Sequence, residues 1–165
     1  MEYQIGDQVI HLNYGPGVIT GIEEKRIADE PCQYYVVKTG ELTLWVPLDA
    51  TEDRIRFPLP RAELKAHLDS LRSAGDDLPD FHRDRFGVLA ERMRTRSVPE
   101  ICLVIRDLAG RSKSHSLNNN DREVMSAARE LLLNEWTIVA GITRAEARAA
   151  LERILADQNI GPDML

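Results

Sequence analysis

The sequence predicts an α+β protein in which strands and helices are segregated into two parts. Up to about residue 58, short β-branched and aromatic runs alternate with turn residues, which is typical of strands. Beyond Phe57-Pro58-Leu59-Pro60, apolar residues recur at helical spacing instead. Two prolines so close together interrupt any continuous element, so we predict one domain over residues 1–58 and a second over residues 59–165.

The stretch from Gly6 to Ile22 opens the β-rich part. A first run ends at Leu12, the Gly15-Pro16-Gly17 turn reverses the chain, and a second run follows. Strands are predicted over residues 8–12, 17–24, 33–38, 42–47 and 54–57, with turns over 28–31 and 39–41. Five short strands in fewer than 60 residues predict a small SH3- or Tudor-like β barrel.

The second part predicts an α-helical bundle of about five helices. The first helix covers residues 61–73, with Leu64, Leu68 and Leu71 on one stripe, and the second covers residues 80–95. The third starts at a capping-box pattern, Ser97-Val98-Pro99-Glu100, and ends at Gly110. Its buried face is predicted to contain Ile101, Ile105 and Leu108.

Two further helices complete the bundle. The fourth runs from about Asn118 to Gly141, and its apolar stripe includes Val124, Ala128, Leu131, Leu132, Trp136 and Val139. The fifth begins at the capping pattern Thr143-Arg144-Ala145-Glu146 and continues through Leu155.

The 165 residues carry a formal net charge of −6, and most of it lies in the N-terminal part. Residues 1–60 hold five Lys/Arg against ten Asp/Glu, or −5, and residues 61–165 hold sixteen against seventeen, or −1. Neither part has the basic balance typical of an autonomous nucleic-acid binder. We therefore expect any DNA contact to be weak and local, or assisted by a partner.

Other compositional features concern the compartment. No apolar run approaches the roughly 20 residues of a membrane span, and the N-terminus shows no signal-peptide pattern. Cys32 and Cys102 lie in segments of different type. We expect two reduced thiols in a cytoplasmic protein, although the spacing alone also permits a disulfide.

Residues that could support catalysis or metal binding are scattered. The four histidines lie in different predicted elements, and no His or Cys pair has metal-ligand spacing. The sequence contains no phosphate-binding loop, no G-x-S-x-G motif and no isolated carboxylate pair in an apolar frame. It therefore predicts no metal, no cofactor, no small-molecule substrate and no enzymatic activity.

Aromatic residues of the predicted barrel suggest a binding surface. Tyr34 and Tyr35 face opposite sides of their strand, so one is expected in the core. Exposed aromatics on such a barrel could form a cage for a methylated cation, and ordinary sheet packing is the alternative. Trp45 projects outward if Leu44 and Val46 face the other side, and an exposed Trp is a favoured interface anchor.

The motifs of the chain resemble those of a known family. Gly6-Asp7-x-Val9-x-His11-x-x-Tyr14-Gly15-x-Gly17-Val18-Ile19-x-x-Ile22 is similar to the opening of the CarD/CdnL family of bacterial transcription regulators. The N-terminal module of that family is shared with the transcription-repair coupling factor. The resemblance continues through Tyr34-Tyr35-Val36-Val37, Leu42-Thr43-Leu44-Trp45-Val46-Pro47, Arg106-Asp107-Leu108 and Ala128-Arg129-x-x-Leu132-x-x-Glu135. Each motif alone is weak, but the ordered series covers most of the chain.

This resemblance implies that the N-terminal module docks on the β subunit of RNA polymerase, partly by edge-strand pairing. The basic positions that contact polymerase in the family match Lys25 and Trp45. Lys25 keeps the charge, whereas Trp45 would make an apolar or cation–π contact instead. We expect Lys25 and Trp45, with the neighbouring Leu44 and Val46, to form the polymerase contact.

The second predicted helix is the other candidate site. His82, Phe86, Leu89 and Met93 share one stripe, a pattern typical of a core face, and Arg85, Arg92 and Arg96 line its flank. In the family, a tryptophan near the start of this helix wedges into the DNA minor groove at the upstream edge of the promoter bubble. The matching position is His82, next to Phe81. The residues expected to contact promoter DNA are therefore Phe81, His82, Arg83, Arg85, Arg111 and Lys113, with the cationic ones on phosphates.

The resemblance implies a transcription regulator that holds RNA polymerase and modulates the stability of the promoter open complex through its helical domain. The alternative is a protein–protein adaptor on polymerase that has lost promoter-DNA binding. The nearly neutral helical domain and the absence of the wedge tryptophan favour this alternative.

Overall fold

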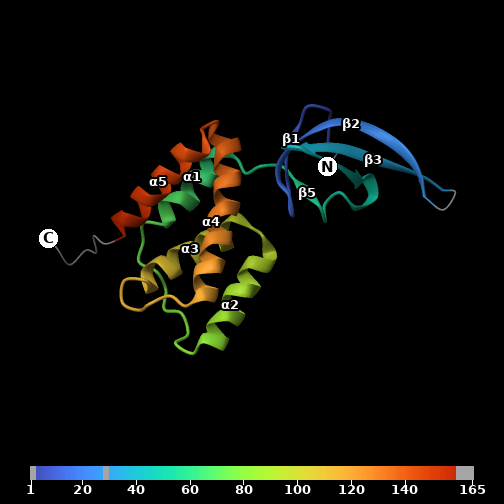
Figure 1. Ribbon diagram of the computed structural model, residues 1–165. Coiled ribbons are helices and arrows are strands. Elements are labelled where there is room, and N and C mark those ends of the chain that lie inside the picture. The colour runs from blue at the N-terminus through green and yellow to red at the C-terminus, as the bar shows by residue number, and fades with distance from the viewer. Residues whose placement is uncertain (1–2, 28–29, 159–165) are drawn as a thin grey trace. The chain divides into compact units, whose positions relative to one another are not determined.

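The computed structural model describes residues 3–27 and 30–158, with only the backbone of Ile27. The chain divides into two compact units, Met1–Leu59 and Pro60–Leu165. Within the described residues, all strands lie in the first unit and all α-helices in the second (Figure 1). The predicted α+β architecture with segregated strands and helices is confirmed.

The N-terminal unit is an antiparallel sheet with the strand order β4-β3-β2-β1-β5. The strands are β1 (Gln8–His11), β2 (Gly15–Ile27), β3 (Glu30–Thr39), β4 (Leu42–Pro47) and β5 (Ile55–Arg56), with a 3-10 turn η1 (Leu48–Ala50) after β4. Strands β4 and β5 are the two edges, and no pairing between them occurs in the described part of the chain. The sheet is thus not the closed barrel that the strand count predicted, because β5 is only two residues long and pairs with β1 alone.

One face of this sheet holds the core of the unit. Strand alternation directs Tyr35 and Val37 of β3 to this face and Tyr34 and Val36 to the other. The core cluster consists of Tyr3, Val9, Ile19, Tyr35, Val37, Val46 and Ile55. The Tyr3 ring packs edge-on against Tyr35, with 5.7 Å between ring centroids.

Strands β2 and β3 are longer than the sequence pattern indicated. Of the predicted turn over residues 28–31, residues 28–29 lie outside the described residues, and Glu30 and Pro31 belong to β3. Pro31 is tolerated there because β4 pairs with β3 only as far as Tyr34, which leaves one side of this stretch open. Near the other end of β2, a Cβ on Gly17 would lie 2.7 Å from Thr39 Cγ2, so only glycine fits this close strand crossing.

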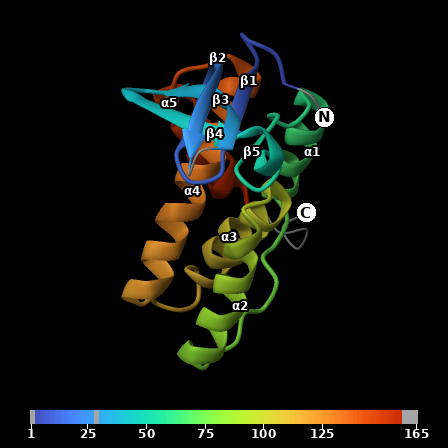
Figure 2. The same ribbon diagram turned by 90° about the vertical axis from the view of Figure 1, so that its right-hand side faces the viewer.

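The second unit contains five α-helices. They are α1 (Arg61–Ser70), α2 (His82–Thr95), α3 (Val98–Arg111), α4 (Asn119–Ala140) and α5 (Arg144–Asp157). Helices α2, α3 and α4 pack against one another (Figures 1 and 2). The predicted stripes of α1 and α3 are confirmed: Leu64, Leu68, Leu71, Ile101, Ile105 and Leu108 are all buried.

Helix ends differ from prediction in three places. Helix α1 ends at Ser70 instead of Ser73, and α2 begins at His82 instead of Asp80. Helix α3 continues through Gly110, because the absent side chain lets the Gly75 backbone approach: a Cβ on Gly110 would lie 3.1 Å from Gly75 Cα. Packing therefore outweighs the tendency of glycine to end a helix.

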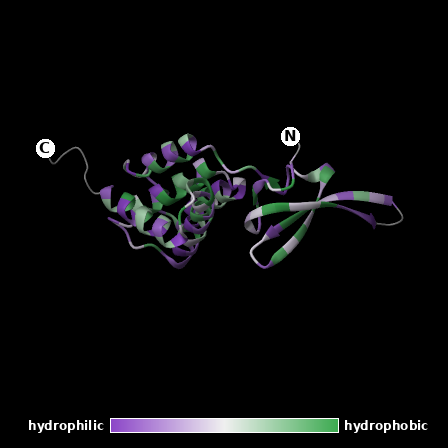
Figure 3. Ribbon diagram, turned by 90° about the horizontal axis from the view of Figure 1, so that it is seen from above, coloured by the Kyte–Doolittle hydropathy of each residue, from purple (hydrophilic) through white to green (hydrophobic). Residues whose placement is uncertain are grey.

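Of the two predicted helix caps, that of α5 is correct and that of α3 is not. Asn118 caps α4 and Thr143 caps α5, each with a reciprocal bond from the third helical residue. The Ser97 side chain makes no cap bond to α3 and lies 3.2 Å from Thr95 Oγ1 instead. Hydrophobic and hydrophilic residues alternate along the helices in Figure 3, as amphipathic packing requires. No helix among the described residues is both long and apolar enough to cross a membrane.

Candidate protein and nucleic-acid interfaces

The open edge of β4 is the first candidate interface. Thr39 pairs with Leu42 across the two-residue turn Gly40-Glu41, and β4 runs antiparallel to β3 from there. The pair that closes the turn exchanges backbone hydrogen bonds, so the N–H and C=O groups of Leu42 point toward β3. These backbone groups point alternately toward β3 and away from it along the strand. Those of Thr43 and Trp45 therefore point to the open edge. An unpaired strand edge of this kind can accept a strand from another protein.

Trp45 projects from this edge strand, as predicted, and its side chain is 41% exposed. The indole Nε1 donates to Glu23 Oε2 at 2.8 Å, and Lys25 Nζ lies 3.4 Å from the centre of the Trp45 ring. Glu23 and Lys25 are in β2, so the indole reaches across the intervening β3. We call these three side chains the Trp45 cluster; they form a cation–π pair with a hydrogen-bonded carboxylate on the sheet face away from the core.

The expected contributions of Leu44 and Val46 need correction. Val46 is 1% exposed and belongs to the core cluster, and Leu44 is partly buried against the same cluster. Their side chains face the core because strand alternation places them opposite Trp45. The side chain of Val46 is therefore not available to a partner.

The methyl-cation cage is not formed in the described structure. Tyr34 and Tyr35 are both buried, and Tyr35 packs in the sheet core, which is the ordinary packing alternative. Tyr14 is exposed but contacts His11, at 5.0 Å between ring centroids. The Trp45 ring is already paired with Lys25 of the same chain.

The second candidate interface is the start of α2. Phe81 is the N-cap of α2 in an extended conformation and is 57% exposed, and His82 beside it is also exposed. The two rings tilt toward each other with 4.9 Å between centroids. We call Phe81 and His82 the tip, and the exposed Arg83 follows it. The start of α2 is the lower end of this helix in Figures 1 and 2.

Helix α2 is turned differently from the prediction. Of the predicted core stripe only Leu89 is buried, while Phe86 is 48% exposed. Arg85, which we expected to contact DNA phosphates, is instead buried at 4% exposure. The prediction for Arg85 was wrong because the pattern of apolar residues does not reveal a buried carboxylate that can pair with an arginine.

That carboxylate is Asp121 of α4. Arg85 Nε and Nη2 donate to the two oxygens of Asp121 at 2.9 and 3.0 Å. Burial alone would raise the pKa of Asp121, but the hydrogen bonds from Arg85 and the Asn118 amide, with the charge of Arg85, outweigh it and lower this pKa. The pair therefore stays ionised at neutral pH.

A second buried carboxylate joins three segments. Asp107 of α3 is fully buried and accepts from Arg92 Nη1 at 2.7 Å, from the Asp76 amide at 3.0 Å and from Arg106 Nε at 2.9 Å. Sequence reasoning used Arg106-Asp107-Leu108 as a family signature without recognising this structural role. The available signal was a carboxylate within the buried face of α3, which requires a cationic partner.

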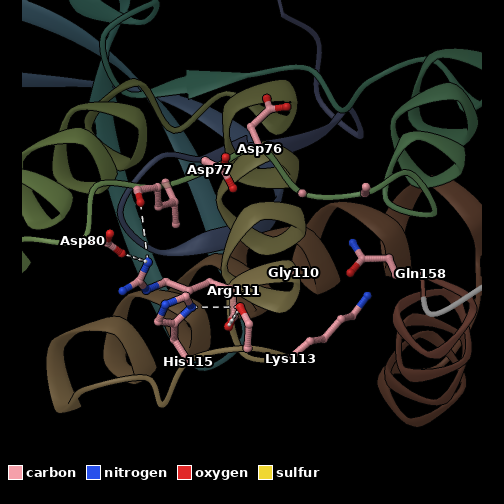
Figure 4. Close-up of a pocket in the computed structure, with 12 residues that line it drawn as sticks. Asp76, Asp77, Asp80, Gly110, Arg111, Lys113, His115 and Gln158 are labelled. Atoms are coloured by element: carbon pink, nitrogen blue, oxygen red, sulfur yellow. Dashed lines mark hydrogen bonds and ion pairs between the residues drawn. The ribbon is translucent and has the colours of Figure 1, made fainter. Parts of the chain in front are cut away.

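Arg111 and Lys113 lie beside a polar cavity of about 610 Å³ between the loop before α2 and the end of α3 (Figure 4). Arg111 Nη1 donates to Asp80 Oδ1 at 3.2 Å and to the Leu78 carbonyl at 3.5 Å, so this charge is partly neutralised. The lining includes three aspartates, Asp76, Asp77 and Asp80, against the two cations, a net charge of −1. This surface is a poor site for a phosphate.

Other chemistry is limited in the described residues. They contain no group of three or more His, Cys, Asp or Glu that could hold a metal ion. Cys32 and Cys102 are free thiols, and burial raises the pKa of Cys102 to about 12.

Comparison with known proteins identifies the two units. Residues 3–57 match the CarD-like/TRCF RID domain, and residues 67–152 match the CarD C-terminal domain. The chain is 26% identical over 152 residues to the Bacillus subtilis (strain 168) protein named "Putative transcription factor YdeB", covering 89% of this chain and 98% of the relative. With an N-terminal sheet and a C-terminal helical unit that each match the corresponding domain in order, the chain belongs to the CarD family and is a CarD-like transcription regulator.

Proposed function

We propose that the protein docks on the β subunit of RNA polymerase through the β4 edge and the Trp45 cluster, and modulates the stability of the promoter open complex through the tip of α2. The observation that supports this most is the half-exposed Trp45 next to an unpaired strand edge. The match to the CarD-like/TRCF RID domain supports polymerase as the partner. A polymerase partner implies a cytoplasmic protein.

The docking surface combines two kinds of contact. A partner strand added at β4 would gain backbone hydrogen bonds, and the Trp45 indole would supply a large apolar anchor. Lys25 over the Trp45 ring and Glu23 on the indole Nε1 place a cation and a carboxylate beside the apolar anchor, so the Trp45 cluster is neutral overall and can pair with polar groups of either charge. Backbone pairing gives the orientation, and the Trp45 cluster gives the specificity.

The docking step is tested by Trp45→Ala combined with Lys25→Glu. We expect a loss of about 2 kcal/mol or more in binding to the isolated β subunit, because a central aromatic anchor and its cation are both removed. Tyr14→Ala is a matched control, since it removes another exposed aromatic of the same unit. Unchanged β-subunit affinity in a folded double variant would show that the docking surface lies elsewhere.

A separate substitution tests whether a partner strand pairs with the open edge of β4. Thr43→Pro removes a backbone N–H that points to the open edge without removing a β3–β4 hydrogen bond, so binding should fall while the melting temperature changes little.

The effect on promoters follows from binding two partners at once. A protein that holds polymerase and also contacts the edge of the melted promoter binds the open complex better than the closed one, and so shifts the population toward it. The tip offers a phenyl and an imidazole ring, and apolar or aromatic side chains can insert between base steps in the minor groove. The regulator needs no cofactor for this mechanism.

The promoter step is tested by Phe81→Ala combined with His82→Ala. We expect this variant to abolish any effect on open-complex lifetime while β-subunit binding stays unchanged. His82→Trp should strengthen the effect, since it supplies a larger wedge at the same position. If the double variant keeps its full effect on open-complex lifetime, the tip is not the DNA contact.

The second candidate function is an adaptor that binds polymerase without touching promoter DNA. Its support is electrostatic: Asp80 and Asp84 flank the tip, and three aspartates surround Arg111 and Lys113. Negatively charged carboxylates near the DNA phosphates oppose binding. An adaptor would show no dependence of promoter binding on Phe81, His82 or Arg83, whereas the regulator would.

A further inference from the structure

We propose that Arg85 is the positioning residue of the tip: its guanidinium holds the backbone just before Phe81 against the start of α4. This inference rests on the proposed function only for the consequence on promoters. The positioning itself can be measured on the protein alone.

A single guanidinium bridges two segments that are far apart in sequence. Nε and Nη2 of Arg85 bind the two carboxylate oxygens of Asp121, and Nη1 donates to the carbonyl oxygens of Pro79 and Asp80 at 2.8 and 2.9 Å. These carbonyls belong to the two residues that immediately precede the tip. The side chain of Arg85 is 5% exposed, so water cannot readily replace these bonds.

No side-chain cap orients the tip at the start of α2. Phe81 is the N-cap of α2 but has no side chain that can cap, and it makes no cap hydrogen bond. The loop therefore lacks the bond that usually directs a chain into its helix. The backbone N–H of Arg85 donates to the Phe81 carbonyl at 3.1 Å, which is the ordinary first hydrogen bond of the helix. The side chain of Arg85 is therefore what ties down the two residues before the tip.

Asp121, which binds the Arg85 guanidinium, is itself held in place. Asp121 accepts from the Asn118 amide at 3.2 Å, and its own amide donates to Asn118 Oδ1 at 2.8 Å. This reciprocal cap ties the Asp121 carboxylate to the first turn of α4. The position of the tip is thus fixed relative to α4. Arg111 of α3 adds a 3.5 Å contact to the Leu78 carbonyl and a 3.2 Å ion pair with the exposed carboxylate of Asp80.

The geometry requires an arginine. A guanidinium can present two parallel N–H groups to a carboxylate and still direct a third nitrogen to two carbonyls, whereas a lysine ammonium is a point charge on a flexible stem. Arg85→Lys keeps the charge that Asp121 needs but loses part of this fork. Arg85→Gln removes both the positive charge and the guanidinium fork.

Arg92 provides the matched control. It is also an α2 arginine paired with a buried aspartate, Asp107, which holds the Asp76 amide five residues before the tip. Within the described structure Arg92 itself contacts neither Pro79 nor Asp80. Arg92→Gln should destabilise the helical unit in a comparable way without releasing the tip. A merely structural role for Arg85 would make the two variants behave alike.

The experiment measures hydrogen exchange of the first hydrogen-bonded amides of α2, residues 85–88, and, separately, open-complex lifetime with polymerase. In Arg85→Gln we expect exchange at 85–88 to rise roughly tenfold or more under conditions where global unfolding is not the exchange route, with a smaller rise in Arg85→Lys and none in Arg92→Gln. β-subunit affinity should be unchanged in all three. Equal protection of residues 85–88 in Arg85→Lys and in the unchanged protein, or equal loss in Arg92→Gln, overturns the proposal.

The two proposals fail in distinguishable ways. If the Phe81→Ala, His82→Ala variant alters open-complex lifetime but Arg85→Lys does not, the tip acts on DNA and the positioning proposal is wrong. If exchange at 85–88 rises as expected but neither variant alters lifetime, positioning stands and the promoter role fails. Should Arg85→Gln not fold, Arg85→Lys and Asp121→Asn test the same bridge from its two ends.

Discussion

Trp45 and Val46 are adjacent in β4, yet one is 41% exposed and the other 1% exposed. Arg85 and Arg83 are two residues apart in α2, yet only Arg83 is exposed. In each pair, residue type is a weaker guide to role than the side of the element on which the residue lies. Single substitutions at these sites therefore have opposite meanings: Val46→Ala removes core packing, whereas Trp45→Ala removes the proposed binding anchor.

The two cysteines allow a prediction at this scale. Burial raises the pKa of Cys102 to about 12, so its thiol stays protonated at pH 8, and only a thiolate reacts readily with thiol reagents. Cys32 is partly exposed. We expect a thiol-specific reagent to label Cys32 in the native protein and both cysteines in urea, followed by mass spectrometry. In Cys32→Ser, labelling of Cys102 before unfolding would contradict this prediction.

At the scale of elements, α2 is attached to its neighbours through arginine–aspartate pairs as well as apolar packing. Arg85 binds Asp121 of α4, and Arg92 binds Asp107 of α3. Removing one partner of such a buried pair leaves an uncompensated charge and is typically destabilising by about 3–5 kcal/mol. The arrangement leaves Phe81 and Phe86 exposed on the outside of the helix.

Gly75 tests how closely the loop before α2 packs on α3. A Cβ on Gly75 would lie 2.8 Å from the Arg106 carbonyl oxygen and 2.9 Å from Asp107 Cα, which are backbone atoms that cannot move aside easily. We expect Gly75→Ala to lower the free energy of unfolding by about 1–3 kcal/mol. Urea denaturation followed by circular dichroism measures this.

Gly87 is the matched control for that experiment. It lies in α2, and a Cβ there would meet no atom within 4 Å. Gly87→Ala should raise the free energy of unfolding by about 0.5–1 kcal/mol, because alanine favours the helix. Equal stability changes in the two variants would show that the Gly75 contact is not tight.

At the scale of the whole molecule, the chain is two units with different charge. The sheet unit is acidic, with −5 in residues 1–60, and the helical part is nearly neutral. A chain with this balance gains little from counterion release on DNA, so in the proposed mechanism polymerase supplies most of the binding free energy at a promoter.

We predict that the two units fold separately. Each has its own buried cluster, and Pro58 and Pro60 lie between them. Fragments 1–59 and 60–165 should each give a cooperative thermal transition, with only fragment 1–59 binding the β subunit. Limited proteolysis should cut first near residues 57–61, and an unfolded 60–165 fragment would argue against a domain boundary there.

The sequence by itself determined the class of the protein and the order of its elements. Residue periodicity distinguished strands from helices, and the cap predicted for α5 was correct because capping depends on residues within four positions of each other. The family resemblance was also available, because the motifs from Gly6 to Pro47 and at Arg106-Asp107-Leu108 are contiguous. These features all depend on local chemistry.

Only the tertiary structure decided which side of α2 faces inward and whether the sheet closes. The partner of Arg85 is 36 residues away in α4, and no local pattern in α2 indicates a carboxylate at that distance. Closure depended on whether β5 could reach β4, which is a property of the whole strand order. Periodicity shows which residues share a face, but the elements that pack against that face determine whether an arginine is buried in an ion pair or exposed to bind DNA.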